Sequence, residues 1–319
     1  MAAIFKPGWS KPSTILFASE IPANEKALSF AVAQAKEFGA DLILFHAYDT
    51  LVVAASETSG IRYYDYAAAA HAEMHHLEPI ADRIRGTGVR CEVVVRPGLA
   101  ADQILHFLRE REVDRIVMGT HSPGPIGKLL VGSVAEAVLR TARIPVFVVG
   151  PHVADGAYRN YETHTILCAV SLNESSAAIT GFAAALASQH RARLVLQHVI
   201  KPQDRATELA GRSIEEIEQD MVLLVPAELR RTLTIQPIVV PGDPTEELLY
   251  QAHAQQADLV VMGAHGTTAF AAIARTGIVY KTLAHVHCPV ITLSPAMLEA
   301  CGVTYDKEHP AEVFLAGVF

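Results

Sequence analysis

The sequence predicts an α/β fold, arranged as two tandem doubly wound domains, each with a five-stranded parallel sheet covered by helices on both faces. Short, continuously apolar runs alternate with segments whose apolar residues recur at helical spacing, which is the pattern of such a sheet. The second half of the chain repeats the first, because Gly119 and Pro145 return as Gly263 and Pro289, each 144 positions later. A chain of 319 residues is long enough for two such domains.

The first domain is predicted to cover residues 1–150. Apolar runs and helical spacings place strands at residues 14–18, 42–46, 91–95, 116–118 and 145–149, and helices at residues 25–38, 67–85, 101–110 and from 132–133 onward. Asn24 suits the N-cap of the first helix, and Gly39 suits its C-cap. Pro79 lies inside the second helix and is expected to kink it.

The second domain is predicted to cover residues 165–295, after a linker at residues 151–164 and before a tail at residues 296–319. ILCAV at residue 166 repeats ILFAS at residue 15, and QHV at residue 197 repeats FHA at residue 45. Pro226 is expected to interrupt the second helix of this copy. The tail ends in AEVFLAGVF, an apolar segment that either docks on a groove or a strand edge or frays.

Composition excludes several classes of protein. A net charge of −8 and a pI near 6.0 leave no basic field for nucleic acid or for an anionic membrane surface. The chain has no run of about eighteen apolar residues that could span a bilayer, and its first residues lack a signal-peptide core. We therefore expect a cytoplasmic protein with no membrane partner. The four cysteines show no C-x-x-C spacing and are expected to be buried free thiols.

The fourth strand of the first domain leads into a candidate phosphate site. Right-handed crossovers place the first and fourth strands side by side, and ligands of such sheets bind at the carboxyl ends of the strands where the order reverses. The loop after Gly119 leaves the fourth strand at this point and runs into a helix that starts near Gly132–Ser133. Unpaired backbone N–H groups and the positive end of the helix dipole favour an anion there.

With these residues in view, each half resembles the universal stress protein family in its tandem form. The family's nucleotide loop is G-x-x-G, nine residues, then G-(S/T), followed by a helix and a Pro-Val strand. His46-Ala47 and His198-Val199 close the second strand of each copy as in the family, and the turn from Pro241 to Pro244 also matches. The resemblance implies the strand order 3-2-1-4-5 and ATP, with Mg²⁺ accompanying it, between strands one and four. It also implies pairing of the two domains through their fifth strands, and a homodimer.

The resemblance assigns a nucleotide site to each half. In the first half it implies contacts from Glu20, Ala47, Gly119, His121, Ser122, Gly132, Ser133 and Val134. Ser122 replaces the second glycine of the motif, and Glu20 stands where an aspartate of the family contacts the nucleoside. The corresponding residues of the second half are Ser171, Val199, Gly263, Gly266, Thr276 and Gly277. This second site is expected to be weaker, since Ser171 replaces the carboxylate and Thr276-Gly277 stands where Gly-Ser is expected.

Other kinds of site find less support. Ser122 to Leu129 lacks two required residues of a Walker P-loop, and no glycine triplet follows the first strand as a Rossmann fold requires. His71, His75 and His76 share one predicted helix, but a helical pair of histidines still needs a third ligand, so no metal site is predicted. The tyrosines of the insert at residues 56–66 can stack on a base or cover the core.

The sequence therefore predicts a stress-response protein that acts as a nucleotide-binding regulatory module. The alternative is an interaction scaffold of the same fold that binds no nucleotide and has protein partners still to be identified. A hydrolase that uses His121 as a base is a weaker hypothesis, because no nucleophile motif accompanies that histidine. No catalytic residue is assigned, and slow ATP hydrolysis is the most that we expect of the chain as an enzyme.

Overall fold

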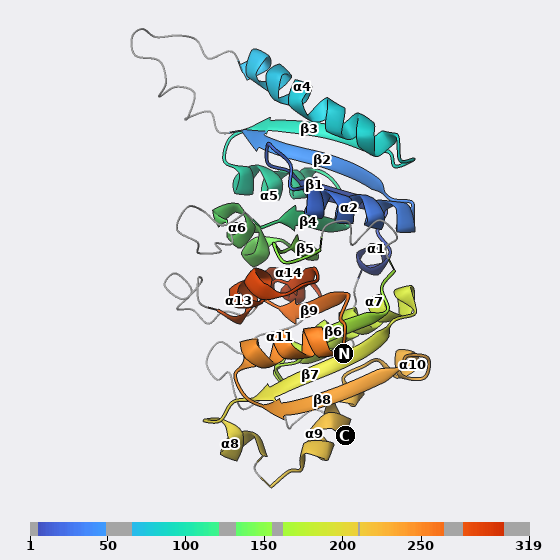
Figure 1. Ribbon diagram of the computed structural model, residues 1–319, viewed down its shortest axis with the longest axis vertical. Coiled ribbons are helices and arrows are strands. Elements are labelled where there is room, and N and C mark those ends of the chain that lie inside the picture. The colour runs from blue at the N-terminus through green and yellow to red at the C-terminus, as the bar shows by residue number, and fades with distance from the viewer. Residues whose placement is uncertain are drawn as a thin grey trace.

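A computed structural model describes residues 6–48, 66–120, 132–154, 162–209, 211–264 and 277–302. Within these residues, ten strands form one continuous sheet in the order β3-β2-β1-β4-β5-β10-β9-β6-β7-β8. The sheet runs the length of the molecule, from β3 at the top of Figure 1 to β8 at the bottom. Each half thus has the predicted order 3-2-1-4-5, and the second half follows the first in reverse.

The strands of the first half are parallel to one another. They are β1 (Thr14–Ala18), β2 (Asp41–Tyr48), β3 (Cys91–Pro97), β4 (Arg115–Gly119) and β5 (Val146–Val149). β1 lies between β2 and β4, with Ala18 in register with Phe45 on one side and with Met118 on the other. The predicted neighbourhood of the first and fourth strands is confirmed, and the carboxyl ends of β1 and β4 meet at one edge of the sheet.

The second half repeats this arrangement. Its strands are β6 (Thr165–Ala169), β7 (Arg193–Ile200), β8 (Ile235–Pro241), β9 (Leu259–Gly263) and β10 (Val290–Leu293). β6 lies between β7 and β9, and Ala169 is in register with Gln197 as Ala18 is with Phe45. The two copies therefore agree residue by residue at the carboxyl ends of their strands.

The two halves join through β5 and β10. These strands pair antiparallel, with Val148 opposite Val290 and Phe147 opposite Ile291. The predicted contact through the fifth strands is thereby confirmed, and neither strand is left with an open edge. All residues of β5 and β10 are buried.

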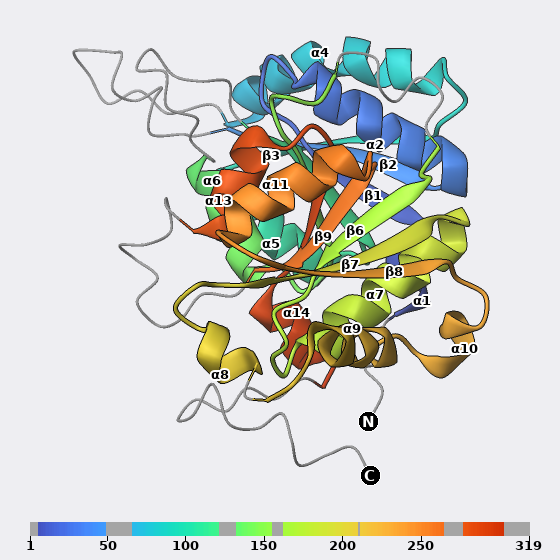
Figure 2. The ribbon, with the colours of Figure 1, turned by 60° about the horizontal axis from the view of Figure 1, so that its bottom comes forward.

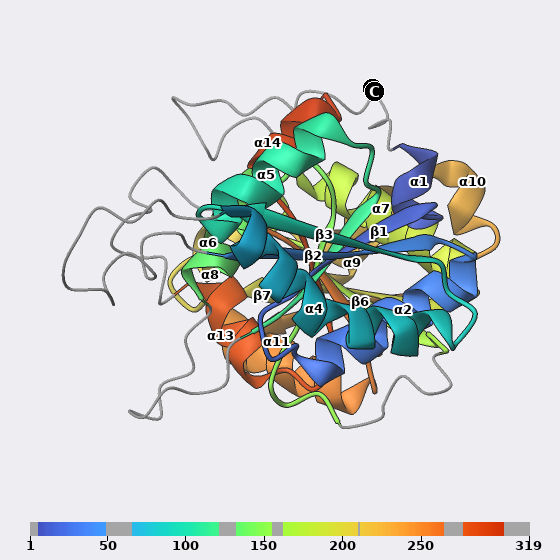
Figure 3. The same ribbon diagram turned by 90° about the horizontal axis from the view of Figure 1, so that it is seen from above.

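Helices cover both faces of the sheet. Those of the first half are α2 (Glu25–Phe38), α4 (Tyr66–Arg85), α5 (Ala100–Glu110) and α6 (Ser133–Thr141). Those of the second half that pack on the sheet include α7 (Ser176–His190), α9 (Ile214–Leu223), α11 (Pro244–Ala254) and α13 (Ile278–His285). One buried apolar cluster contains residues of α2, α4, α7 and α9, and another contains residues of α5, α6, α11 and α13. Figure 3 shows α5 and α2 on opposite sides of β2, and Figure 2 shows α11 and α7 on opposite sides of β6.

The predicted caps of the first long helix are present. The Asn24 side chain accepts a hydrogen bond from the backbone N–H of Ala27 at 3.1 Å. Gly39 ends α2 in the left-handed region at φ 65°, where a residue without a Cβ is favoured. In both cases a local sequence signal determines where the helix begins and ends.

Some elements differ from the sequence prediction. Three short helices, α1 (Pro7–Ser10), α8 (Arg205–Leu209) and α14 (Pro295–Ala300), were not foreseen, whereas α4 includes Pro79 and covers the predicted range. Pro226 does interrupt the second helical segment of the second half, because α9 ends at Leu223 and α10 (Ala227–Arg230) follows. The apolar end of the tail and most of the tyrosine insert lie outside the described residues.

α14 spans the boundary between the predicted second domain, which ends at residue 295, and the predicted tail. The hydroxyl of Ser294 caps α14 by accepting from the N–H of Met297 at 3.0 Å. The same hydroxyl donates to the carbonyl oxygen of Ala142, which directly follows α6 in the first half. The start of the tail is therefore part of the contact between the halves.

In each half, an aspartate accepts hydrogen bonds from the backbone at the amino end of the central strand. Asp114, directly before β4, accepts from the backbone N–H groups of Ser13 and Thr14 at 2.7 and 3.0 Å. Asp258, directly before β9, accepts from the N–H groups of His164 and Thr165 at 2.7 and 2.9 Å. This repeated contact links β1 to β4 and β6 to β9 at their amino ends, whereas the predicted phosphate site lies at the carboxyl ends.

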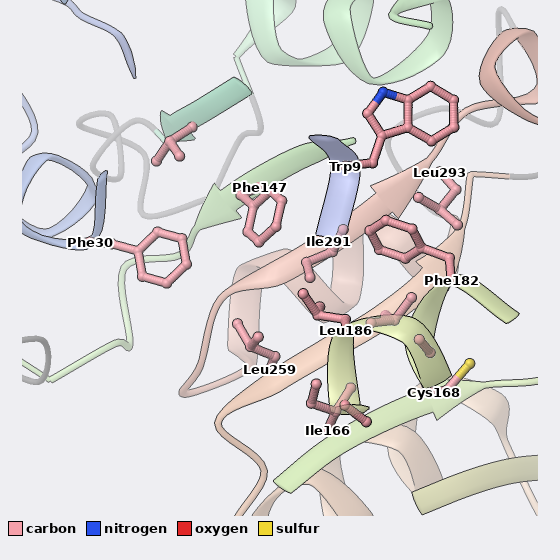
Figure 4. Close-up of a cluster of buried hydrophobic side chains, with 14 of the residues drawn as sticks. Trp9, Phe30, Phe147, Ile166, Cys168, Phe182, Leu186, Leu259, Ile291 and Leu293 are labelled. Atoms are coloured by element: carbon pink, nitrogen blue, oxygen red, sulfur yellow. The ribbon is translucent and has the colours of Figure 1, made fainter. Parts of the chain in front are cut away.

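A short N-terminal arm packs against the junction of the halves. α1 contributes Trp9, which is 3% exposed and belongs to the same apolar cluster as Phe182 of α7 and Leu293 of β10. Figure 4 shows these three side chains on one side of β10, with Phe147 close by. The arm of the first half thus covers apolar surface that belongs mainly to the second half.

A buried arginine holds the arm in place. Arg115 is fully buried, and its guanidinium donates to the carbonyl oxygens of Trp9 at 3.1 Å and Ser10 at 2.6 Å and to the side-chain oxygen of Gln34. Its carbon Cζ lies 4.8 and 5.0 Å from the ring centroids of Phe38 and Phe147. A cation removed from water needs such compensating contacts.

All four cysteines are free thiols, as predicted from their spacing. Burial raises the pKa of Cys168 to about 12 and that of Cys91 to about 11, so neither is a reactive thiolate near neutral pH. Among the helices of the described ranges, none has both the length and the apolar character needed to cross a membrane.

We expect Arg115→Met to lower the free energy of unfolding by about 2–4 kcal/mol, because it leaves buried carbonyl oxygens of the arm without a donor. Chemical denaturation followed by the fluorescence of Trp9, the single tryptophan of the chain, measures this loss. The native emission should also shift to the red as the arm detaches. Arg111→Met is the matched control, because Arg111 forms an exposed ion pair with Glu92 and its loss should cost less than about 1 kcal/mol. Equal losses in both variants would contradict the role given to Arg115.

Candidate functional site

The carboxyl ends of β1, β2 and β4 border a crevice in the first half. It contains a pocket of about 150 Å³ between these strand ends and the first turns of α5 and α6. Its apolar wall comes from Phe45, Ile104 and Met118, and Glu20 and Ile21 stand at its mouth. The pocket therefore lies at the reversal of strand order where ligands of doubly wound sheets bind.

The structure brings together half of the residues assigned to this site. Glu20, Ala47, Gly119 and Val134 all line the pocket. Gly132 and Ser133 lie directly before Val134, at the start of α6. His121 and Ser122 fall outside the described residues, so their expected place in the site stays a prediction.

The start of α6 has the features of an anion site. Gly132 is the N-cap residue with an extended backbone, at φ −62° and ψ 155°, and it supplies no side-chain hydrogen bond to the helix. Within the described part of the chain, the first N–H groups of α6 therefore have no capping side chain, unlike those of α2. Such groups, together with the helix dipole, are available to a phosphate.

Position 119 has no room for a side chain, so only glycine fits there. A Cβ on Gly119 would lie 2.4 Å from the amide nitrogen of Asn24, well inside van der Waals contact. Asn24 cannot move away freely, because its side chain accepts from Ala27 N–H and donates to the carbonyl oxygen of Thr120 at 3.2 Å. The N-cap of α2 is thus also the residue that holds the end of β4, a role that the sequence did not reveal.

The histidines that close the second strands bond to the backbone. Nδ1 of His46 lies 2.9 Å from the carbonyl oxygen of Ser19, and Nδ1 of His198 lies 2.8 Å from that of Val170. The sequence did not reveal their second neighbours. Nε2 of His198 lies 2.6 Å from Glu208, and Nε2 of His46 lies 3.8 Å from Glu73.

The second half has a larger crevice of about 310 Å³ at the equivalent place. Ser171 and Val199 of the predicted second site line it, and Gly277 is the N-cap of α13, which contributes Ile278 to the wall. Gly263 ends β9 and does not line this pocket, whereas Gly266 and Thr276 lie outside the described residues.

The floors of the two crevices differ at one position. Gln197 lines the second crevice in the place that Phe45 occupies in the first, since each residue is in register with the last residue of the central strand. Gln197 was not among the predicted site residues, although the alignment of FHA with QHV contained the signal. In that alignment, a polar residue of the second copy matches a phenylalanine of the first, and this difference could have identified Gln197.

The histidines of α4 do not gather into a metal site. His71, His75 and His76 are all exposed, and His76 lies 3.7 Å from Glu73 on the same helix. Among the described residues, no group of three or more histidine, cysteine, aspartate or glutamate side chains is placed to hold a metal ion.

The chain belongs to the universal stress protein family. The family model matches residues 13–150 and again residues 162–294, which correspond to the two halves of the sheet. A universal stress protein of Thermus aquaticus is 32% identical over 139 residues, which cover 43% of this chain and 97% of that protein. Universal stress protein YxiE of Bacillus subtilis is 30% identical over 133 residues, which cover 40% of this chain and 90% of its own.

Solved structures support the same fold over the whole chain. A universal stress protein from Archaeoglobus fulgidus superposes with a TM-score of 0.68 at 16% identity, covering 90% of this chain and 97% of its own. Protein PA1789 from Pseudomonas aeruginosa, described as functionally unknown, gives a TM-score of 0.63 at 16% identity and covers 93% of this chain and 99% of its own. Both are similar in fold to the tandem arrangement described above.

We expect Gly119→Ala to lower the free energy of unfolding by about 1–3 kcal/mol, because the new methyl group displaces Asn24. Asn24→Ala alone should cost about 1 kcal/mol through the lost N-cap. In the double variant the two costs should not add, since the methyl group then fills space that the asparagine has left. Thermal and chemical denaturation of the three variants test this, and strictly additive losses would show that Gly119 and Asn24 act independently.

Proposed function

We propose that this universal stress protein binds ATP in the crevice of its first half and uses the occupied state as a regulatory signal. One observation supports this most directly: the apolar pocket at the ends of β1 and β4 adjoins the glycine-capped start of α6. A nucleotide has the same two parts, a flat apolar base and an anionic chain. The family resemblance of the loop sequence points to the same ligand.

Each described residue would have a distinct role. Phe45, Ile104 and Met118 would contact the base, because they form the apolar wall of the pocket. Glu20 would accept hydrogen bonds from the ribose hydroxyls, since its carboxylate is exposed at the mouth. The free N–H groups of the first turn of α6 would hold phosphate oxygens, with the hydroxyl of Ser133 beside them.

Mg²⁺ would accompany the triphosphate rather than occupy a protein site of its own. Among the described residues that line this pocket, Glu20 alone carries a carboxylate, and a dedicated magnesium site would need more oxygen ligands. Binding at the pocket can therefore be tested with ATP in the presence of Mg²⁺. The proposed homodimer and cytoplasmic location stay predictions.

Calorimetric titration of the nucleotide-stripped full chain with ATP and Mg²⁺ tests the proposal. We expect saturable binding near one equivalent per chain. Gly132→Glu should abolish it, because a carboxylate at the start of α6 would repel the phosphates. The equivalent change in the other half, Gly277→Glu, is the matched control and should leave binding intact, since both glycines are extended N-cap residues.

Two other outcomes of the titration would contradict a nucleotide site in the first half. Binding that Gly277→Glu abolishes and Gly132→Glu does not would place the nucleotide in the second half. If neither heat nor a change in melting temperature is seen up to millimolar ATP, the interaction scaffold becomes the better account of the fold.

A further inference from the structure

Gln197 is a buried amide whose hydrogen-bonding groups are both unused. The residue is 2% exposed, and neither its amide nitrogen nor its amide oxygen has a hydrogen-bond partner among the described residues. An amide removed from water without partners is unfavourable, and native structures contain few such groups. The place of Gln197 in the fold should therefore explain why a polar side chain is buried there.

Gln197 lies at the floor of the second crevice. Side chains alternate along β7, so Gln197 shares its face of the sheet with Val195, which belongs to the apolar cluster beneath α11 and α13. The pocket that Gln197 lines is walled by Leu248 and Pro244 of α11 and by Ile278 of α13. Gln197 thus lies at the floor of a cavity whose other lining residues are mainly apolar.

The fold does not need a polar group at this position. In the first half Phe45 takes the same place, and its ring packs on Phe107 of α5 with 5.3 Å between the centroids. The residue 144 positions after Phe107 is Gln251, which is 8% exposed and accepts from the side chain of Gln255 at 3.3 Å. A tilted pair of aromatic rings is thus replaced by two glutamines, on a backbone that keeps the same register.

Polar groups also stand at the rim of this crevice. Lys201 and Ser171 line its mouth, and Glu208 of α8 closes one side through its 2.6 Å contact with His198. Lys201 lies 3.8 Å from Asp204, and its side chain is half exposed. The cavity therefore combines a donor and acceptor pair at its floor, aliphatic walls and a charged mouth.

We propose that the second crevice binds a small molecule that inserts an amide edge against Gln197. An amide edge presents a hydrogen-bond donor next to an acceptor, so one ligand group can satisfy both unused atoms of the glutamine at once. Two sources carry this edge, a primary carboxamide and the ring amide of a heterocyclic base. Gln197 is then the residue that makes the two crevices selective for different ligands.

Binding of two probes to the full chain tests this, measured by calorimetry and by ligand-observed NMR. Nicotinamide represents the carboxamide, and uridine represents the ring amide. At least one should bind saturably, and its counterpart with a blocked N–H, N,N-dimethylnicotinamide or 3-methyluridine, should bind roughly tenfold more weakly or not at all. The probe that binds identifies the source of the edge.

Variants then locate the binding. Gln197→Leu should abolish it, whereas Gln236→Leu is the matched control and should retain it, because Gln236 lies on β8 and bonds to Arg193 away from the pocket. Without ligand, Gln197→Leu should have a melting temperature at least as high as the parent, since no native hydrogen bond is lost.

Three results would overturn the proposal. They are the absence of binding by both probes at millimolar concentration, binding that survives Gln197→Leu, and a lower melting temperature of ligand-free Gln197→Leu, which would show that the fold itself uses the amide. ATP binding by the first half does not enter this test. Failure of the ATP titration would leave the inference about Gln197 standing.

Discussion

Antiparallel pairing of β5 with β10 is the contact on which the rest of the molecule depends. Each five-stranded sheet alone would end in a fully apolar strand with unpaired backbone groups, and such an edge is prone to aggregation. The pairing satisfies those groups and makes the two sheets one. Because β5 and β10 are each short and buried throughout, the side chains beneath them must come from both halves.

The N-terminal arm completes this junction. Trp9 lies over β10 and α7, and the backbone of the arm is anchored by a guanidinium from β4. The buried charge is expensive to desolvate, and the carbonyl oxygens and ring faces around Arg115 offset that cost. One residue thereby links the strand that leads to the first crevice with the contact between the halves.

The duplicated scaffold supports two crevices of different chemistry. Both have a histidine bonded to the central strand and a glycine at the start of the following helix. Their floors differ, because Phe45 lines the first crevice and Gln197 takes the equivalent place in the second. Figure 1 shows α6 and α13, whose first residues border the two crevices, on the same side of the molecule. A duplicated gene allows such divergence, since one copy can retain a function while the other changes.

The repeat, the order of strands and helices, and the position of the first crevice could all be predicted before the structure was known. The signals for these features are local in the sequence. They are the apolar runs, the caps Asn24 and Gly39, and the duplicated glycine loop, and they can be identified without knowledge of the fold. Glu20, Ala47, Gly119 and Val134 were predicted to lie together because the family pattern relates them to strand ends and to the start of the following helix, and all four line the pocket.

Features that depend on contacts between residues far apart in the chain became known only from the folded structure. Arg115 is an ordinary arginine in the sequence, and its burial follows from the arm that packs over it more than 100 positions away. Asn24 supports Gly119 across a similar separation. The unused amide of Gln197 is visible only when all its neighbours are known, because hydrogen-bond satisfaction is a property of the complete surroundings of an atom.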